Sequence, residues 1–162
     1  QLGDSWADAF KRRPSGLRAT TALSDFVSLL VEAHDIDVVM YDTGPNIGPL
    51  NRVIALDSDH IIVPVACDLF SVRALTTLGQ SLKTWVLDCR TVASLAPAAE
   101  AMLPGLPRFM GYIPQQFRVY GQEMAKTPSY YLRRVQKQVG SDVVNVLRKI
   151  DRRLAPDFDV SP

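Results

Sequence analysis

The stretch "DSDHIIVPVACDLF", residues 57–70, decides the fold class of this chain. Residues 60–67 form an almost continuously apolar run, which predicts a strand that is covered on both faces in a parallel sheet. Ser71 then predicts the start of a long helix, because serine is a favoured N-cap residue. Apolar residues recur behind it at helical spacing, at Val72, Leu75, Leu78, Leu82 and Trp85.

Downstream, the sequence again predicts a strand that is followed by helices. "RFMGYI", residues 108–113, predicts another strand. A helix is predicted from Pro128 to a stop at Gly140, and a last helix from a cap at Ser141 to Leu154.

The chain upstream predicts one more strand and two helices. "DVVMYD", residues 37–42, is a short run of β-branched and aromatic residues, and Pro49 predicts a short helix through Ala55. Residues 1–18 show little periodicity, and "KRRPSG", residues 11–16, predicts a loop. A helix is predicted from Thr20, with one buried stripe formed by Leu23, Phe26, Val27, Leu30 and Val31.

Alternation of helices and strands predicts a single α/β domain over residues 1–162, with a parallel β-sheet flanked by helices. The composition is that of a globular protein, with 47% hydrophobic and 22% charged residues. No apolar run approaches the ~18–20 residues of a membrane span, and the polar start does not fit a signal peptide. We therefore expect a cytoplasmic protein with no membrane partner, in which Cys67 and Cys89 are small buried residues.

The charge of the chain is unevenly distributed. The net charge is +1, with −4 in residues 1–107 and +5 in residues 108–162. The last third is therefore a candidate surface for an acidic partner, and residues 118–155 form its basic helical subregion.

Asp42 is the first candidate site residue. Ligands of open α/β sheets bind outside the carboxyl ends of the strands, and Asp42 ends the predicted strand 37–42. A carboxylate there would hold Mg²⁺ beside nucleotide phosphates, and Gly44 would let the backbone approach a terminal phosphate. The alternative is that Asp42 only caps a turn.

Two sequence motifs that follow one another along the chain resemble those of a known protein family. The segment "DVVMYDTGPNIGPLNRVIALDSDHIIVPVACDLFSVRALTTLG" resembles the Walker B and switch II region of the ParA/MinD family of deviant P-loop ATPases. Residues 38–42 match its first strand, Gly44 and Pro45 its switch, and residues 59–65 its second strand. Asp68 and Phe70 stand at the family's Glu-x-Phe positions. The partition branch fits better than the MinD branch, because no hydrophobic membrane-targeting helix ends the chain.

This resemblance implies a P-loop NTPase-like fold and an ATPase that uses ATP and Mg²⁺. Asp42 would hold Mg²⁺ through a water, and Gly44 and Pro45 would sense the terminal phosphate. The candidate nucleotide-binding residues are Asp68 and two glutamines, Gln115 and Gln116, which would meet the adenine edge or, alternatively, only belong to a surface loop.

The resemblance also implies a role and partners. Partition ATPases of this family form ATP-dependent homodimers, act with a centromere-binding (ParB-like) protein and associate with the nucleoid. They bind DNA without sequence preference through basic residues of their C-terminal helices. The matching candidates, for which a solvated polar face is the alternative, are Arg118, Arg133, Arg134, Lys137, Arg148, Lys149, Arg152 and Arg153.

One motif of the family is absent from the sequence. Its phosphate-binding loop ends in Gly-Lys-Thr, and no Gly-Lys pair occurs in this chain. We therefore expect the chain to be the C-terminal part of a longer ATPase and to be inactive alone. The alternatives are a non-catalytic ParA-like interaction module and a ParA-like positioning ATPase for a cargo other than DNA.

Overall fold

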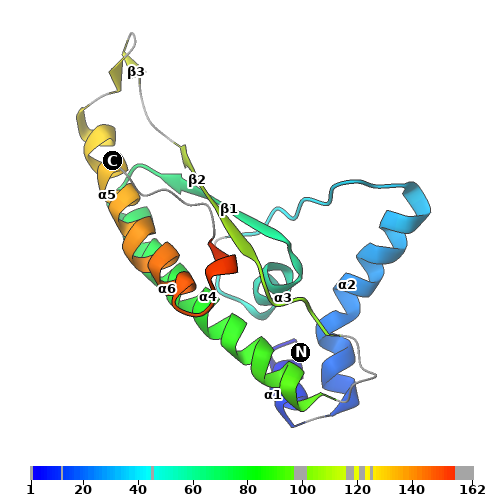
Figure 1. The fold of residues 1–162 in the computed structure, drawn as a ribbon. Helices are drawn as coiled ribbons and strands as arrows, with labels where there is room; N and C mark the ends of the chain where they lie inside the picture. The colour runs from blue at the N-terminus through cyan, green and yellow to red at the C-terminus, as the bar shows by residue number, and fades with distance from the viewer. Residues whose placement is uncertain are drawn as a thin grey trace. The chain divides into compact units, whose positions relative to one another are not determined.

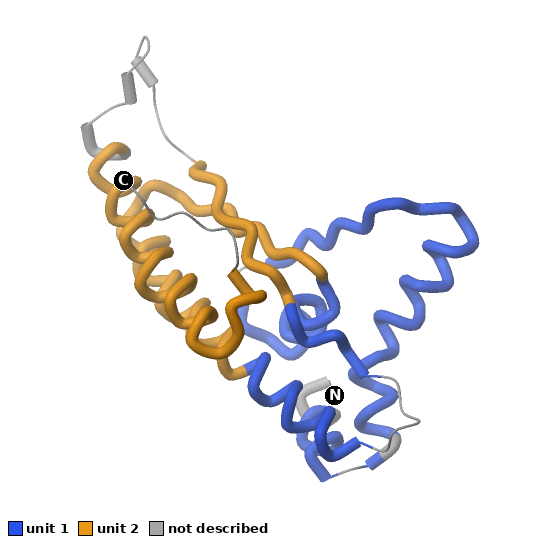
Figure 2. The backbone as a smooth tube through the Cα atoms, viewed as in Figure 1, with its two compact units in different colours: residues 1–58, 85–106 blue, residues 59–84, 107–162 orange. Residues whose placement is uncertain are grey.

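The computed structural model describes residues 2–11, 13–44, 46–96, 102–115, 119–120, 123–124 and 126–155. The chain divides into two compact units (Figure 2). Unit 1 comprises residues 1–58 and 85–106, and unit 2 comprises residues 59–84 and 107–162. The chain passes from unit 2 to unit 1 within one long helix, α4 (Leu69–Leu95).

Unit 2 contains a parallel pair of strands, β1 (His60–Ala66) and β2 (Arg108–Gln115), which lie side by side in Figure 1. The register runs from His60 opposite Arg108 to Ala66 opposite Gln115, with an irregularity between Ile61 and Ile62. Helix α4 leaves the end of β1, so the two strands and this helix confirm an α/β chain with a parallel pairing.

The larger sheet that the sequence predicted is not formed by the described residues, whose parallel sheet has two strands. The predicted burial of β1 on both faces is also wrong. Exposure alternates along β1, and Ile62 is 55% exposed. The other strands in the described part of unit 2 are β3 (Val119–Tyr120) and β4 (Glu123–Met124), which form a short antiparallel ladder.

Helix α4 begins at Leu69, two residues before the predicted start. Its N-cap residue is Asp68, whose Oδ1 accepts a hydrogen bond of 2.7 Å from the backbone N–H of Ser71. The predicted apolar side of the helix is confirmed, because Val72, Leu75, Leu82 and Trp85 are buried and Leu78 is half-buried.

The last helical region of unit 2 is continuous rather than two separate helices. Helix α5 (Lys126–Gln138) runs into a π-helix, η1 (Val139–Val144), and then into α6 (Asn145–Arg148), before the short 3₁₀ turn η2 (Arg152–Leu154). The predicted stop at Gly140 and the predicted cap at Ser141 are therefore wrong. The physical reason is burial of the wide turn, in which Val139, Gly140, Val143 and Val144 are all buried.

Unit 1 is more helical at its start than the sequence predicted. Residues 1–18, which show little periodicity in the sequence, contain α1 (Leu2–Phe10) and the first turns of α2 (Pro14–His34), which begins within the predicted loop 11–16. Pro14 lies in the first turn of α2, where its missing N–H costs no helical hydrogen bond. The buried side chains of these two helices include Trp6 and Ala9 of α1 and Leu17, Thr20 and Thr21 of α2.

The second half of α2 contradicts the predicted buried stripe. Phe26 is 58% exposed and Leu30 is 38% exposed. The helix ends at a left-handed residue, Asp35, with φ of 50°, where the backbone N–H groups of Asp35 and Ile36 both donate to the carbonyl oxygen of Val31.

Residues 37–42, predicted as a strand, form no strand with any described residue. The predicted helix that follows is confirmed as α3 (Pro49–Asp57), two residues longer than expected. Cys67 and Cys89 are free and buried, as predicted. Among the described residues, no helix combines the length and apolar character needed to cross a membrane.

Candidate functional site

The predicted nucleotide-site residue Asp42 lies in an exposed segment between α2 and α3 of unit 1. It makes no hydrogen bond or ion pair with the described residues. The chain after it is fixed by Asn51 of α3, whose Nδ2 donates to the carbonyl oxygens of Gly44 at 2.8 Å and Asn46 at 2.7 Å. Gly44 has no positive φ, and a Cβ there would meet only the Asn46 side chain at 3.5 Å. This conformation therefore does not itself require a glycine.

Asp68 and Gln115 lie together at the carboxyl ends of β1 and β2. The backbone N–H of Cys67 donates to the carbonyl oxygen of Gln115 at 3.3 Å, and the Gln115 side chain is exposed. Asp68 is already engaged as the N-cap of α4 through its bond from Ser71. A carboxylate in this position favours a helix start whether or not a ligand binds beside it.

The predicted nucleotide site is not contained in one unit. Asp42 and Gly44 belong to unit 1, whereas Asp68 and Gln115 belong to unit 2. Pro45, Gln116 and Arg118 lie outside the described residues. Within the described ranges, no group of three or more histidine, cysteine, aspartate or glutamate residues is placed to hold a metal ion.

The basic residues of α5 are presented to solvent by unit 2. Arg133, Arg134 and Lys137 are exposed, while Val135 on the same helix is buried and anchors its apolar side. The guanidinium of Arg134 lies 5.7 Å from the ring centroid of Tyr130, and its Nη1 donates to the Tyr130 hydroxyl at 3.4 Å. This contact orients one cation on the helix surface.

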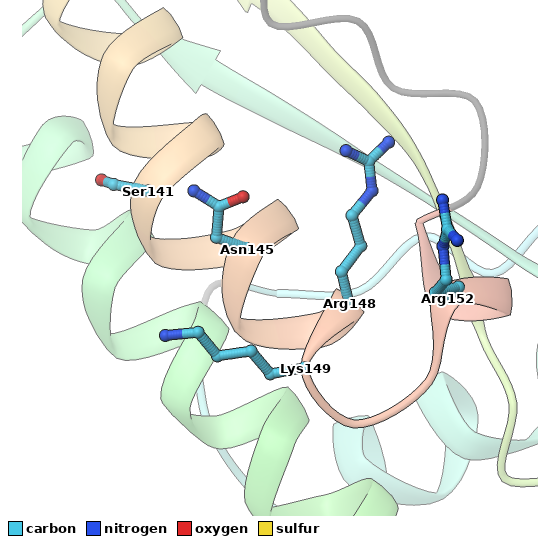
Figure 3. Close-up of a pocket in the computed structure, with 5 residues that line it drawn as sticks. All are labelled: Ser141, Asn145, Arg148, Lys149 and Arg152. Carbon is cyan, nitrogen blue, oxygen red and sulfur yellow. The ribbon is translucent and has the colours of Figure 1, made fainter.

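The basic residues that follow line a pocket of about 490 Å³ (Figure 3). Arg148 is half-buried, and its Nε donates to the carbonyl oxygen of Ala155 at 2.7 Å, which fixes its stem. Figure 3 shows Arg148 and Arg152 extending in a similar direction, with Lys149 pointing to the other side. The full lining is Ser141, Asn145, Arg148, Lys149 and Arg152.

Arg153, another predicted DNA contact, pairs at short range with a neighbouring carboxylate. Its Nε and Nη2 donate to the two carboxylate oxygens of Asp151, at 3.1 Å and 2.8 Å. These bonds raise the pKa of Arg153, although its side chain is 72% exposed. A guanidinium that already holds a carboxylate has fewer donors left for a phosphate.

A hydrogen-bond network fixes the pocket-bearing helical region to α4. The Thr76 hydroxyl and the Gln138 side-chain amide both donate to Oδ2 of Asp142, and the Ser141 hydroxyl donates to its Oδ1 at 2.7 Å. Hydrogen bonds from Thr76, Ser141 and Gln138 lower the pKa of Asp142. Gly79 of α4 makes this approach possible, because a Cβ there would lie 1.8 Å from the Asp142 carbonyl oxygen.

Sequence reasoning missed Ser141 and Asn145 as lining residues of the pocket. The available signal was spacing, because Ser141, Asn145, Arg148 and Arg152 follow one another at intervals of three or four residues. The sequence instead predicts Ser141 as a helix cap.

Sequence reasoning also missed a cation cluster in unit 1. The Arg52 guanidinium lies 3.7 Å from the ring centroid of the buried Trp6 and pairs with the Asp88 carboxylate at 2.9 Å. Burial lowers the pKa of Arg52, although Asp88 opposes this. Trp6 Nε1 and Arg52 Nε are buried and have no hydrogen-bond partner among the described residues. This cluster ties α1, α3 and the last part of α4 within unit 1.

Comparison with known proteins finds a solved structure with a similar fold, but it finds no family to which the chain can be assigned. No family model and no curated protein matches the chain. Among solved structures, the chain is similar to the protein DIP2308 from Corynebacterium diphtheriae, with 20% identity and a TM-score of 0.61. The match covers 97% of this chain and 62% of that one, so the chain spans about three fifths of its neighbour's length. At this identity the likeness concerns the fold alone.

Proposed function

We propose that this chain is part of a ParA-like ATPase and that it supplies the non-specific DNA-binding surface of that enzyme. The observation that carries the proposal is the pocket of unit 2, where three cationic side chains, Arg148, Lys149 and Arg152, gather around one hollow. The exposed cations of α5 lie on the same continuous helical region.

The chemistry of this surface suits an anionic partner such as the phosphate backbone of DNA. Arginine and lysine donors beside the serine hydroxyl and asparagine amide provide charge and hydrogen bonds without a base-reading element. Binding of this kind has no sequence preference and depends strongly on salt. Five exposed cations, Arg133, Arg134, Lys137, Lys149 and Arg152, would release about five counterions and lower the affinity about 500-fold between 50 and 200 mM salt.

Fluorescence anisotropy with a random 30-base-pair duplex tests this proposal. The double variant Lys149→Glu, Arg152→Glu should bind more weakly and reduce the salt slope by about 2. The matched control is Arg73→Glu, Lys83→Glu, which makes the same charge change at exposed positions of α4 in the same unit. An equal loss in both double variants would show that only net charge matters, and an unchanged affinity in the first would refute the surface.

For the whole enzyme, we propose that ATP hydrolysis is phosphoryl transfer to water, with Asp42 holding Mg²⁺ through a water molecule. Sequence resemblance over residues 37–79 supports this role. Gly44 and Pro45 would couple the terminal phosphate to dimerisation, and a ParB-like protein would act as the partner. The test is Asp42→Ala in a protein that also carries the phosphate-binding loop. Wild-type hydrolysis by that variant would exclude the role of Asp42.

A second candidate function is a non-catalytic interaction module that binds DNA or a protein through the same basic surface. The exposed position of Asp42 favours it. Equilibrium dialysis with ATP and Mg²⁺ separates the two candidates in the whole protein. Tight nucleotide binding supports the ATPase, whereas DNA binding without nucleotide binding supports the module.

A further inference from the structure

Helix α5 carries an exposed aromatic side chain within its row of cations. Four exposed residues share one side of this helix through their i, i+3, i+4 and i+7 spacing, and they are Tyr130, Arg133, Arg134 and Lys137. Tyr130 is 50% exposed, whereas Val135 of the same helix is buried. A tyrosine ring therefore lies on the same solvent-facing side of the helix as three positive charges.

Two contacts limit the movement of the Tyr130 side chain. The ring of Tyr131, which is half-buried, meets the Tyr130 ring edge-on, with centroids 5.3 Å apart and an interplanar angle of 74°. Nη1 of Arg134 donates to the Tyr130 hydroxyl at 3.4 Å. A ring that is restrained before a ligand arrives loses less conformational entropy when the ligand binds.

The charge of this side of α5 is positive and has no nearby compensation. The sequence of α5 contains lysine and arginine but no aspartate or glutamate. Among the described residues, no carboxylate forms an ion pair with Arg133, Arg134 or Lys137. A helix face that is only solvated commonly carries charges of both signs. Charge of a single sign therefore indicates an anionic ligand, and the exposed ring indicates a ligand that also has a flat group.

A flat group on an anionic backbone is the chemistry of a nucleotide chain. Every base has a π-face that can stack on an aromatic side chain, so this contact tolerates any sequence. The bases of a duplex are stacked on one another, and their faces become accessible in a single strand. An acidic polypeptide would use the cations of α5 but would not need the ring.

We propose that Tyr130 stacks on one base of a single-stranded nucleic acid while Arg133, Arg134 and Lys137 hold the adjacent phosphates. This inference rests on the proposed DNA-binding surface and deepens it, because it adds contact with a base to contact with phosphates. It also names the form of nucleic acid that this part of the surface prefers.

Fluorescence anisotropy of the full chain with two labelled oligonucleotides tests the inference. One is a thymine oligonucleotide of about twelve nucleotides, and the other is an abasic oligonucleotide with the same number of phosphates. The two carry equal charge, so only the bases distinguish them. The thymine oligonucleotide should bind about 5- to 150-fold more tightly, which corresponds to one stacked base.

Variants of α5 separate the ring from the charge. Tyr130→Leu should remove the preference for the thymine oligonucleotide and leave the affinity for the abasic one unchanged, and Tyr130→Trp should keep the preference. Lys137→Gln should instead weaken binding of both oligonucleotides and reduce the salt slope by about 0.7. The matched control is Phe26→Leu, because Phe26 is an aromatic residue of α2 with a similar exposure of 58%. It should leave both affinities unchanged.

Three results would overturn the inference. They are equal affinities for the two oligonucleotides, an equal loss of both affinities in Tyr130→Leu, and displacement of the thymine oligonucleotide by polyglutamate of equal charge at a lower concentration than by unlabelled thymine oligonucleotide. The last result would identify an acidic polypeptide as the ligand. The random duplex is measured on the same samples. Duplex binding without a preference for bases refutes stacking alone, whereas absence of binding to every nucleic acid refutes the proposed DNA-binding surface as well.

Discussion

Replacement of Gly79 by alanine should destabilise unit 2, because the structure leaves no room for a methyl group there. A Cβ at Gly79 would lie 1.8 Å from the carbonyl oxygen of Asp142 and 3.3 Å from the Cα of Val143. Ordinary contact begins at 3.4 Å, so α4 and η1 must separate by about 1.6 Å. The obstacle is backbone, which cannot rotate away as a flexible side chain can.

The cost can be worked from three terms. Overpacking of this kind costs about 1–3 kcal/mol. The separation also strains the hydrogen bonds from Thr76 and Gln138 to Asp142, each of which contributes about 1 kcal/mol. The higher helix propensity of alanine returns about 1 kcal/mol. We therefore expect a net loss of about 2–4 kcal/mol and a fall in melting temperature of about 4–16 °C.

Urea and thermal unfolding followed by far-ultraviolet circular dichroism measure this loss. Gln80→Ala is the matched control, because Gln80 is the next residue of α4 and is exposed. It should change stability by less than about 0.5 kcal/mol. A Gly79→Ala variant as stable as the wild type, or more stable, would refute the close approach of α4 and η1.

Three further predictions concern single side chains. Arg52→Met should lower the free energy of unfolding by about 2–3 kcal/mol, because it leaves the Asp88 carboxylate unpaired. It should also change the fluorescence of Trp6, because it removes the cation over the indole ring. An unchanged unfolding midpoint would contradict this prediction. The lowered pKa of Asp142 means that its carboxylate stabilises the fold above the unfolded pKa of 3.8, and this stabilisation is lost as the pH falls through the lower folded pKa. Urea midpoints between pH 5 and pH 2.5 should therefore fall more steeply for the wild type than for Asp142→Asn, and parallel curves would exclude this contribution. Burial raises the pKa of Cys89, so Ellman's reagent should label this thiol only after denaturation, and rapid labelling of the native protein would show that the site opens.

Local pattern predicted the parts of the fold that depend on local contacts. The apolar run of β1, the start of α3 at Pro49 and the apolar side of α4 are each encoded within a few neighbouring residues. The parallel pairing of β1 with β2 followed from the order of elements, because a helix between two strands favours it.

Other predictions that depended on contacts between distant residues failed. Gly140 is a common helix stop, yet here it is buried in the wide turn of η1, beside Val139 and Val143, and the helix continues. Residues 37–42 have the composition of a strand, but a strand exists only with a hydrogen-bonded partner, and no described residue provides one. Phe26 and Leu30 have helical spacing, but spacing alone does not supply the surface that would cover them.

The candidate site shows the same division between local and distant information. The basic character of residues 133–152 could be counted from the sequence. The pairing of Arg153 with Asp151 and the participation of Ser141 and Asn145 in the pocket required coordinates, because they depend on the path of the chain through η1 and η2.

The π-helix η1 has a consequence for the evolution of this region. One extra residue in a helix advances every later side chain by about 100° around the helix axis. Deletion of a single residue within Val139–Val144 would restore a regular α-helix, keep the composition almost unchanged and turn Arg148 and Lys149 away from their present direction. Relatives that share the basic residues but differ here by one residue in length would therefore present a different surface. An ungapped alignment across η1 would join positions that do not correspond in space.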